Sequence, residues 1–269
     1  VVAFLAIVAR VNPAILLLEN VPLWQHASSM WLLRHQLRDL GYVVHERVVH
    51  SGDWNCLEQR SRLAVTAVTV GMEFDYEDLI PPPAKTVKVS SILEPVAKDD
   101  PSWSTMQYLK DKEVSDAEAG KGFKMHIVDG ESTQVSCLGK GYAKNRSTET
   151  KVQHPDNPEL LRLFTPTEHA NLKGIWPELI ARLPKTIAHQ LLGQSIIPAP
   201  FEAIAMLIAK SIKSFCSDVA LDVVHTLYQA IQDAKGSQQA KKYDLAESSP
   251  KAAAFKAPVA LSPDQFSLF

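Results

Sequence analysis

The sequence has 269 residues, of which 46% are hydrophobic and 22% charged, and its formal net charge is −2. Such a chain can bury a sizeable core, and its length fits one large domain or two modest ones. The small net charge excludes a polycation, so any contact with nucleic acid must come from a local basic patch.

Cysteine content and hydropathy exclude further classes of protein. Cys56, Cys137 and Cys216 are too few and too scattered for a disulfide framework or a cysteine-rich zinc site. No apolar run is long enough to span a bilayer, and no basic N-terminal region precedes a cleavage site. We therefore expect no metal site and no membrane association, with the cytoplasm as the default location.

The first elements predict an α/β fold. Residues 1–11 are amphipathic and enter a helix without a cap, so we expect the sequence to begin inside a fold. The apolar run Ile15–Leu18 stops at Glu19, Asn20 and Pro22, which is typical of an interior parallel strand. Ligands of open α/β sheets bind beyond such strand ends, which makes Glu19 a candidate site residue. A solvated loop acid is the alternative.

The next segments continue this alternation of helix and strand. We expect a helix capped by Ser28 or Ser29 and ending at Gly41, a strand over residues 42–49 and another over 62–70. Between the two strands, Arg60 and Arg62 stand two residues apart. In an extended chain both side chains point the same way and can reach one ligand face. A pair of surface arginines is the alternative.

Three consecutive prolines, residues 81–83, predict a stiff connection and a domain boundary. Further on, residues 120–151 contain six bases against three acids, which is a local excess of positive charge. Cations neutralise phosphates, and tyrosine and arginine side chains can contact bases. We therefore expect DNA contacts from this loop, through Lys140, Tyr142, Lys144, Arg146 and Ser147. A charged, solvated loop is the alternative.

The last third of the chain is predominantly helical by its pattern. Thr165, Pro166 and Glu168 predict a short helix with a capping box. Helices are also expected over 201–212 and 217–235, followed by a disordered polar tail over 236–263. The last five residues, Gln265–Phe269, place three large apolar side chains at the end of this tether. Such an arrangement suits insertion into a pocket of a partner.

Four segments resemble signatures of the DNA (cytosine-5)-methyltransferase family, in the family's order. Residues 19–21 match Glu-Asn-Val, and residues 58–62 resemble Gln-x-Arg-x-Arg with Glu58 in place of glutamine. Residues 162–177 resemble Arg-x-Leu-Thr-Pro-x-Glu-x-x-x-Leu-x-Gly-x-Pro, and residues 193–195 resemble Gly-Asn-Ser with Gln194 in place of asparagine. The resemblance spans roughly residues 1–212.

The resemblance implies methyl transfer from S-adenosylmethionine to carbon 5 of a cytosine that is flipped out of a specific double-stranded DNA site. The implied fold is a partial Rossmann-like S-adenosylmethionine-dependent methyltransferase domain with a smaller target-recognition domain. Residues 1–80 would be the C-terminal part of the catalytic domain, 81–185 the linker and recognition domain, 186–235 helices returning to the catalytic domain, and 236–269 a flexible tail. The implied location is a bacterial or phage-infected bacterial cell.

Residue roles follow from the matched positions. Glu19 would hydrogen-bond N3 and the exocyclic amine of the flipped cytosine, Arg62 the base oxygen, and Arg60 the adjacent backbone or active-site loop. Gln194 and Ser195 would help to enclose the cofactor. His169 would support packing and would not act as a catalytic base.

Two family elements, the glycine-rich cofactor loop and the Pro-Cys nucleophile loop, do not occur in these 269 residues, and no cysteine follows a proline. We therefore predict that this chain alone does not methylate DNA. Three interpretations stay open: the back part of a complete enzyme, one subunit of a split enzyme whose partner carries the nucleophile, and a catalytically inactive remnant that binds DNA or a clamp. Gln265–Phe269 resembles the short peptide that docks bacterial proteins on the replication sliding clamp.

Overall fold

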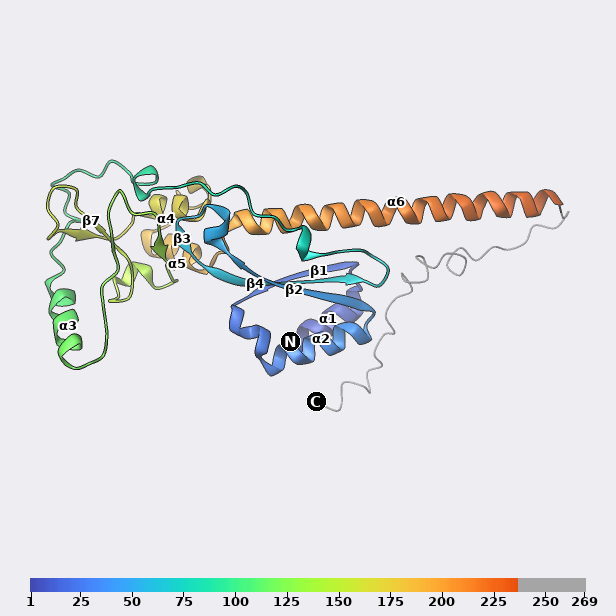
Figure 1. The fold of residues 1–269 in the computed structure, drawn as a ribbon, viewed down its shortest axis with the longest axis horizontal. Coiled ribbons are helices and arrows are strands. Elements are labelled where there is room, and N and C mark those ends of the chain that lie inside the picture. Colours follow the sequence, from blue (N-terminus) through green and yellow to red (C-terminus); the bar gives the residue numbers. More distant parts are fainter. Residues whose placement is uncertain (237–269) are drawn as a thin grey trace. The chain divides into compact units, whose positions relative to one another are not determined.

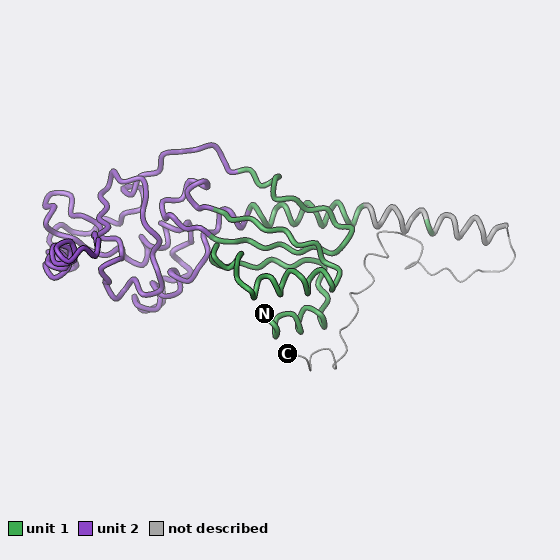
Figure 2. The backbone as a smooth tube through the Cα atoms, turned by 60° about the horizontal axis from the view of Figure 1, so that its bottom comes forward, with its two compact units in different colours: residues 1–49, 62–80, 203–269 green, residues 50–61, 81–202 purple. Residues whose placement is uncertain are grey.

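The computed structural model describes the backbone of residues 1–236. It describes the side chains of residues 1–217 and of Thr226. The chain divides into two compact units (Figure 2). Unit 1 comprises residues 1–49, 62–80 and the chain from Ala203 onward, and unit 2 comprises residues 50–61 and 81–202. The terminal peptide Gln265–Phe269 and the expected tail beyond residue 236 lie outside the described residues.

Unit 1 is built on a three-stranded sheet with helices packed against it (Figure 1). Its strands are β1 (Ile15–Asn20), β2 (Tyr42–His50) and β4 (Ser61–Thr69), in the order β1-β4-β2. Helices α1 (Val2–Val11) and α2 (Ser28–Asp39) contribute apolar side chains to the core. That core buries Leu5, Val8, Met30, Leu33 and Leu37 with Leu63, Val65 and Ala67 of β4.

Strand β1 differs from the interior parallel strand that its apolar run predicts. It pairs antiparallel with β4, with Ile15 opposite Val68 and Asn20 opposite Leu63. Among the described strands it lies at the edge of the sheet, and Leu17 is 41% exposed. The expectation of a parallel pairing is wrong for this neighbour, because β4 comes later in the chain and runs in the opposite direction to β1. An apolar run does not reveal the direction of its neighbour.

Two helix predictions also need correction. Neither Ser28 nor Ser29 caps α2. The Ser29 hydroxyl instead accepts a hydrogen bond of 2.9 Å from the indole of Trp24 in the turn η1 (Pro22–His26). The two helices expected after residue 200 form one continuous helix, α6 (Pro198–Gly236), since the residues between the expected segments include neither proline nor glycine.

Unit 2 consists of short strands and helices joined by long loops. Strand β3 (Glu58–Gln59) pairs parallel with β6 (Val135–Ser136), and β5 (Ile127–Val128), β7 (Lys151–Gln153) and β8 (Leu161–Arg162) form a second sheet. Its helices are α3 (Gln107–Glu118), α4 (Pro166–Lys173) and α5 (Lys185–Gln194). Short 3-10 turns complete it: η2 (Ser51–Trp54), η4 (Val89–Ser91), η5 (Tyr142–Lys144) and η6 (Pro177–Leu179).

The start of α4 is organised by a capping box, which confirms the sequence prediction. The Thr165 hydroxyl accepts from the Glu168 amide, and the Glu168 carboxylate accepts from the Thr165 amide. Glu168 is fully buried, and its carboxylate also accepts hydrogen bonds from both terminal nitrogens of Arg162, at 2.6 and 2.7 Å. Its carboxylate therefore joins the helix start to strand β8.

Two segments belong to a different unit from the one expected. Residues 50–61 and 186–202 were expected with the catalytic domain and belong instead to unit 2. The first is held there because β3 pairs with β6, and the second because α5 packs against α4 and the turn η5. Boundaries set by such long-range pairing leave no mark in local composition.

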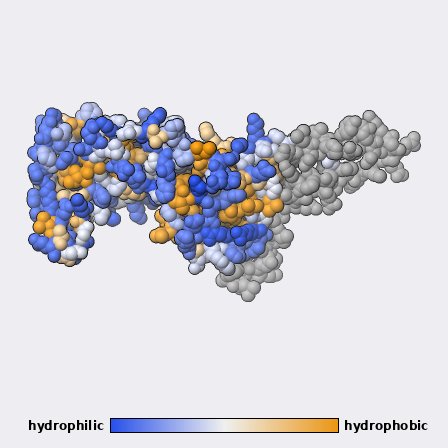
Figure 3. All heavy atoms as spheres, viewed as in Figure 1, coloured by the Kyte–Doolittle hydropathy of each residue, from blue (hydrophilic) through white to orange (hydrophobic). Residues whose placement is uncertain are grey.

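Figure 3 shows apolar patches set among hydrophilic side chains on the face that it draws. No single described helix is long and apolar enough to cross a membrane, although α5 and the first part of α6 pass that test together by length and composition.

Candidate functional site

Glu19 and Arg62 form the polar pair at the carboxyl end of β1. Glu19 is the penultimate residue of β1 and lies opposite Ala64 of β4, two residues beyond Arg62. The Arg62 Nε lies 2.6 Å from Glu19 Oε1, and the two side chains are 18% and 34% exposed. A charge-assisted contact of this length fixes the orientation of the carboxylate. About a third of the Glu19 side chain stays accessible to a ligand.

The turn after Glu19 is fixed by its own side chain. Asn20 Oδ1 accepts a hydrogen bond of 2.8 Å from the amide of Val21, and Pro22 then begins η1. The carboxylate therefore sits on a strand end whose next two residues are held locally, which suits a group that must present a defined acceptor to a ligand.

Arg60 has a different environment from Arg62. It is 7% exposed, its Nη1 donates to Cys137 Sγ at 3.0 Å, and its Nη2 donates to the Gly193 carbonyl at 3.3 Å. Its own amide donates to the Ser51 hydroxyl at 2.7 Å. The expectation that both arginines face one ligand is not met by these contacts. Arg60 is buried, and its hydrogen bonds connect separate segments of unit 2.

The basic loop, residues 138–147, presents some of its expected DNA contacts and buries another. Lys140, Lys144 and Arg146 are exposed and Ser147 is half-buried. Tyr142 is fully buried, and its hydroxyl accepts from the Phe164 amide and donates to the Thr150 carbonyl. Burial also raises the pKa of Tyr142. The prediction that Tyr142 contacts DNA is therefore wrong, because its side chain is part of the core beneath the loop.

Lys151, the last of the six bases of residues 120–151, is also buried. Its ammonium donates to the carbonyls of Arg146 and Glu149, at 2.9 and 2.6 Å. Burial lowers the pKa of Lys151 to about 8. This lysine braces the end of the basic loop and does not extend its charged surface.

Helix α5 approaches the basic loop at Gly193, which lies inside the helix. A Cβ on Gly193 would stand well within 3.0 Å of the backbone of Gly139 and Lys140. The glycine is therefore required by close packing of the helix on the loop.

His169 and His189 lie side by side, and both imidazole rings contact the ring of Tyr142. Both are fully buried, their Nδ1 atoms are 3.0 Å apart, and their rings stack at 5.3 Å between centroids. Burial lowers the pKa of His169 to about 2 and that of His189 to about 4. The expectation that His169 supports packing is confirmed. Its partner His189 carries no motif that singles it out.

Gln194 and Ser195 stand at the end of α5. Gln194 is exposed, and the Ser195 hydroxyl donates to the Leu192 carbonyl at 2.7 Å. Ser195 also lines a mostly apolar hollow of about 500 Å³ with Trp176, Leu179 and Leu191 among its walls. Ser195 therefore borders this hollow, whereas Gln194 is not among the residues that line it. No predicted DNA or base contact lines this hollow.

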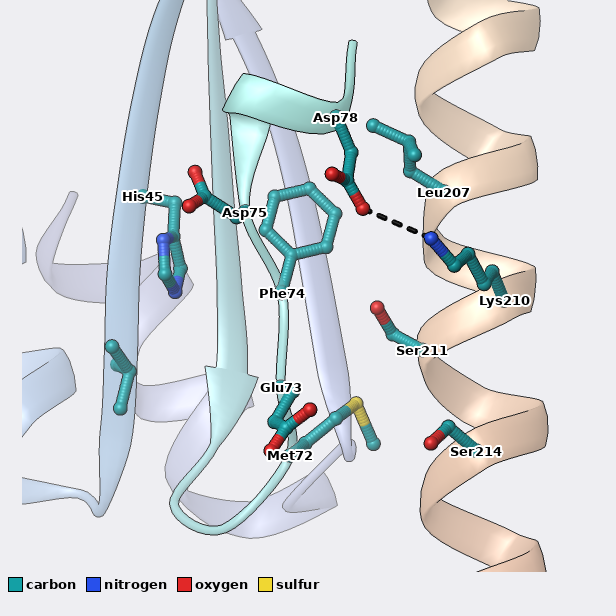
Figure 4. Close-up of a pocket in the computed structure, with 11 residues that line it drawn as sticks. His45, Met72, Glu73, Phe74, Asp75, Asp78, Leu207, Lys210, Ser211 and Ser214 are labelled. Carbon is teal, nitrogen blue, oxygen red and sulfur yellow. Dashed lines mark hydrogen bonds and ion pairs between the residues drawn. The ribbon is translucent and has the colours of Figure 1, made fainter.

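A second hollow, of about 380 Å³, lies in unit 1 (Figure 4). His45, Asp75 and Asp78 line it, and Lys210 of α6 lies 3.0 Å from Asp78. None of the predicted site residues borders it. Among the described residues, no group of three histidine, cysteine or carboxylate side chains could hold a metal ion.

Cys56 and Cys137 are not activated nucleophiles. Burial raises the pKa of Cys56 to about 11 and also raises that of Cys137. A reactive cysteine needs the opposite shift, toward the thiolate. This agrees with the sequence, in which no cysteine follows a proline.

Comparison with known proteins identifies the family of this chain. The family model of C-5 cytosine-specific DNA methylases matches residues 1–210. Type II methyltransferase M.DsaV of Dactylococcopsis salina is 26% identical over 207 residues, covering 72% of this chain and 56% of that protein. Type II methyltransferase M.MspI of Moraxella sp is 25% identical over 206 residues, covering 74% of this chain and 47% of that protein.

Solved structures share the fold. The S. pombe Dnmt2 methyltransferase aligns with a TM-score of 0.64 at 21% identity, covering 74% of this chain and 66% of that chain. The chain spans about half the length of the curated relatives that it matches. The match over residues 1–210 shows that the chain belongs to the C-5 cytosine-specific DNA methylase family.

Proposed function

We propose that this chain forms the target-base and DNA-binding part of a DNA (cytosine-5)-methyltransferase. The observation that carries the proposal is the Glu19–Arg62 pair, with 2.6 Å between Nε and Oε1 at the end of β1. A carboxylate beside a guanidinium offers one acceptor and several donors at a fixed spacing. The edge of a cytosine presents the complementary groups: an amine, a ring nitrogen and an oxygen.

In the proposed reaction, the Glu19 carboxylate accepts from the exocyclic amine of a flipped cytosine and shares a proton with N3, which favours protonation of the ring, and Arg62 donates to the base oxygen. Charge that develops on the ring when a thiolate adds at carbon 6 is stabilised by these groups. Carbon 5 would then take the methyl group from the bound donor, which leaves as the thioether, and would give its proton to water as the thiolate departs from carbon 6. S-adenosylmethionine supplies the methyl group, and Gln194 and Ser195 contribute to the wall beside it.

The thiolate must come from a segment other than the 269 residues of this chain. We propose that the glycine-rich cofactor loop and the Pro-Cys loop are supplied together, either in the same polypeptide or by a complementary subunit. Arg60 supports unit 2 from within, and its proposed role is to hold a loop of the site in place. The sliding-clamp contact of Gln265–Phe269 stays a prediction from the sequence.

DNA is bound in this proposal through the exposed cations of the basic loop. Lys140, Lys144 and Arg146 reach phosphates, and Ser147 can donate to a phosphate or a base edge. Their exposure, together with Lys151 bracing the loop from below, supports this assignment. The alternative is a non-catalytic DNA-binding remnant, which would use the same loop but would have no need for Glu19.

The test combines the purified chain with a separately produced segment that carries the family's glycine loop and Pro-Cys loop, on cytosine-containing DNA with a labelled methyl donor. We expect no transfer from the chain alone and transfer from the combination. Glu19→Gln should lower the rate at least a hundredfold, since positioned acid–base groups contribute about 10²–10⁴-fold.

Glu118→Gln serves as the matched control, because Glu118 is an exposed carboxylate of α3 in unit 2. It should leave the rate unchanged. Methylation by the chain alone would refute the need for a second segment. An active combination that tolerates Glu19→Gln would refute the assignment of Glu19.

A further inference from the structure

A fully buried ion pair marks the position where this chain departs from its family's arginine element. Glu58 stands where the resemblance calls for glutamine, and Lys173 occupies a position that the family's Leu-x-Gly pattern leaves open. Both side chains are 0% exposed, and Lys173 Nζ lies 2.7 Å from Glu58 Oε2. A charge appears at one site, and its counter-charge appears 115 residues later in the same core.

Glu58 also contacts the start of the basic loop. Its Oε1 accepts a hydrogen bond of 3.1 Å from the Leu138 amide and lies 3.6 Å from Arg60 Nη1. The strand around it is held by the β3–β6 pairing, in which Glu58 lies opposite Val135. One carboxylate therefore connects the end of α4, the guanidinium of Arg60 and the residue that precedes Gly139.

Neither charge is stable in this core by itself. Removing an ion from water costs far more than one ordinary hydrogen bond returns, so a buried ammonium requires a nearby carboxylate. Burial lowers the pKa of Lys173, and the negative charge of Glu58 opposes that change. Glu58 balances two cations, Lys173 and Arg60, whereas Lys173 has Glu58 as its one carboxylate contact among the described ion pairs.

We propose that Glu58 and Lys173 are a charge-compensated positioning pair that holds the basic loop on α5. The pair takes the place of a neutral glutamine. It fixes the Leu138 amide, and thereby the backbone of Gly139 and Lys140 where Gly193 packs against it. The effect on DNA rests on the proposed function, because the loop is proposed to carry the DNA contacts.

The contacts predict an unequal response to substitution. Glu58→Gln keeps an oxygen for the Leu138 amide but leaves two buried cations without a carboxylate. Lys173→Met leaves Glu58 paired with Arg60, so its effect should be smaller. The double variant Glu58→Gln/Lys173→Met removes one charge of each sign, so the cluster keeps its original net charge with Arg60 as its remaining cation. It should therefore resemble the original chain.

The experiment measures amide hydrogen exchange at Leu138 and the affinity for a DNA duplex at fixed salt, in the full 269-residue chain. Glu58→Gln should speed exchange at least about tenfold and Lys173→Met by less, with the double variant within about twofold of the original, as expected for directly coupled residues. DNA affinity should fall in the same order. Asp116→Asn is the control, since it removes a buried carboxylate on α3 that contacts Lys112.

Each outcome decides the proposal. Additive effects in the double variant, or an unchanged Leu138 amide in Glu58→Gln, would overturn it. If Glu58→Gln does not fold, a folded double variant with native exchange supports the pair, and an unfolded one overturns it. If the original chain does not bind DNA while the exchange pattern holds, the proposed function fails and the positioning pair stands.

Discussion

At the scale of single residues, the clearest distinction is between polar groups that can meet a ligand and those that support the core. Glu19 keeps about a third of its side-chain surface, whereas Arg60, Tyr142 and His169 are buried and already hydrogen-bonded. Polar residue types that suggest chemistry are therefore divided here between the site and the scaffold beneath it. Burial and partners, more than residue type, decide which role each has.

The buried histidine pair predicts how stability depends on pH. His169 and His189 have folded-state pKa values of about 2 and about 4, below the value near 6.5 of an unfolded histidine. Between the folded and the unfolded pKa values, the unfolded state binds more protons than the folded state. The contribution of the two histidines to stability is therefore fully present above pH 6.5 and declines as the pH falls toward 4. We expect a loss on the order of 1 kcal/mol per pH unit for each histidine.

Urea unfolding followed between pH 7.5 and 4.5 measures this slope. His169→Phe should reduce it, because one of the two imidazoles that take up protons on unfolding is removed. The exposed His35 provides the control, and His35→Gln should leave the slope as it was. An unchanged slope in His169→Phe would contradict the assignment.

At the scale of elements, the contact of α5 with the basic loop depends on the absence of one side chain. Gly193→Ala would place a methyl group against the backbone of Gly139 and Lys140, which cannot move aside as a flexible side chain can. Overpacking commonly costs about 1–3 kcal/mol, and we expect the upper end of that range or more.

Gly130→Ala is the matched control, since a Cβ there would meet Ser90 at 3.4 Å, an ordinary contact. The two variants should differ clearly in unfolding midpoint. Equal midpoints would show that α5 and the loop separate without cost, and would also weaken the argument that α5 positions the loop.

At the scale of the whole molecule, a net charge of −2 means that DNA affinity must arise locally. Each phosphate neutralised in B-DNA contributes about −0.9 to the slope of log K against log salt. If Lys140, Lys144 and Arg146 each contact one phosphate, replacing all three by alanine should reduce the slope by about 2.7.

Fluorescence anisotropy over a salt series measures this slope. Lys213→Ala, which removes an exposed lysine of α6 in unit 1, should leave it unchanged. A triple variant with the original slope would exclude the basic loop as the phosphate contact.

Several elements of both units follow from local patterns. Helix α1, strand β2 and the capping box of α4 occur where periodicity and capping residues predict them, because short-range sterics and hydrogen bonds decide such elements. The match of Glu19 and Arg62 to a family signature likewise comes from residues close in sequence to each element.

What the sequence could not determine depends on contacts between distant segments. The antiparallel pairing of β1 with β4, the inclusion of residues 186–202 in unit 2 and the burial of Tyr142 are all set by partners far along the chain. Lys173 has no local signal of importance, since its role exists only where Glu58 faces it across the core. The sequence by itself determined the family, most local elements and the residues able to do chemistry. Tertiary structure alone decided which of those residues remain accessible, because burial is a property of neighbours brought together by folding.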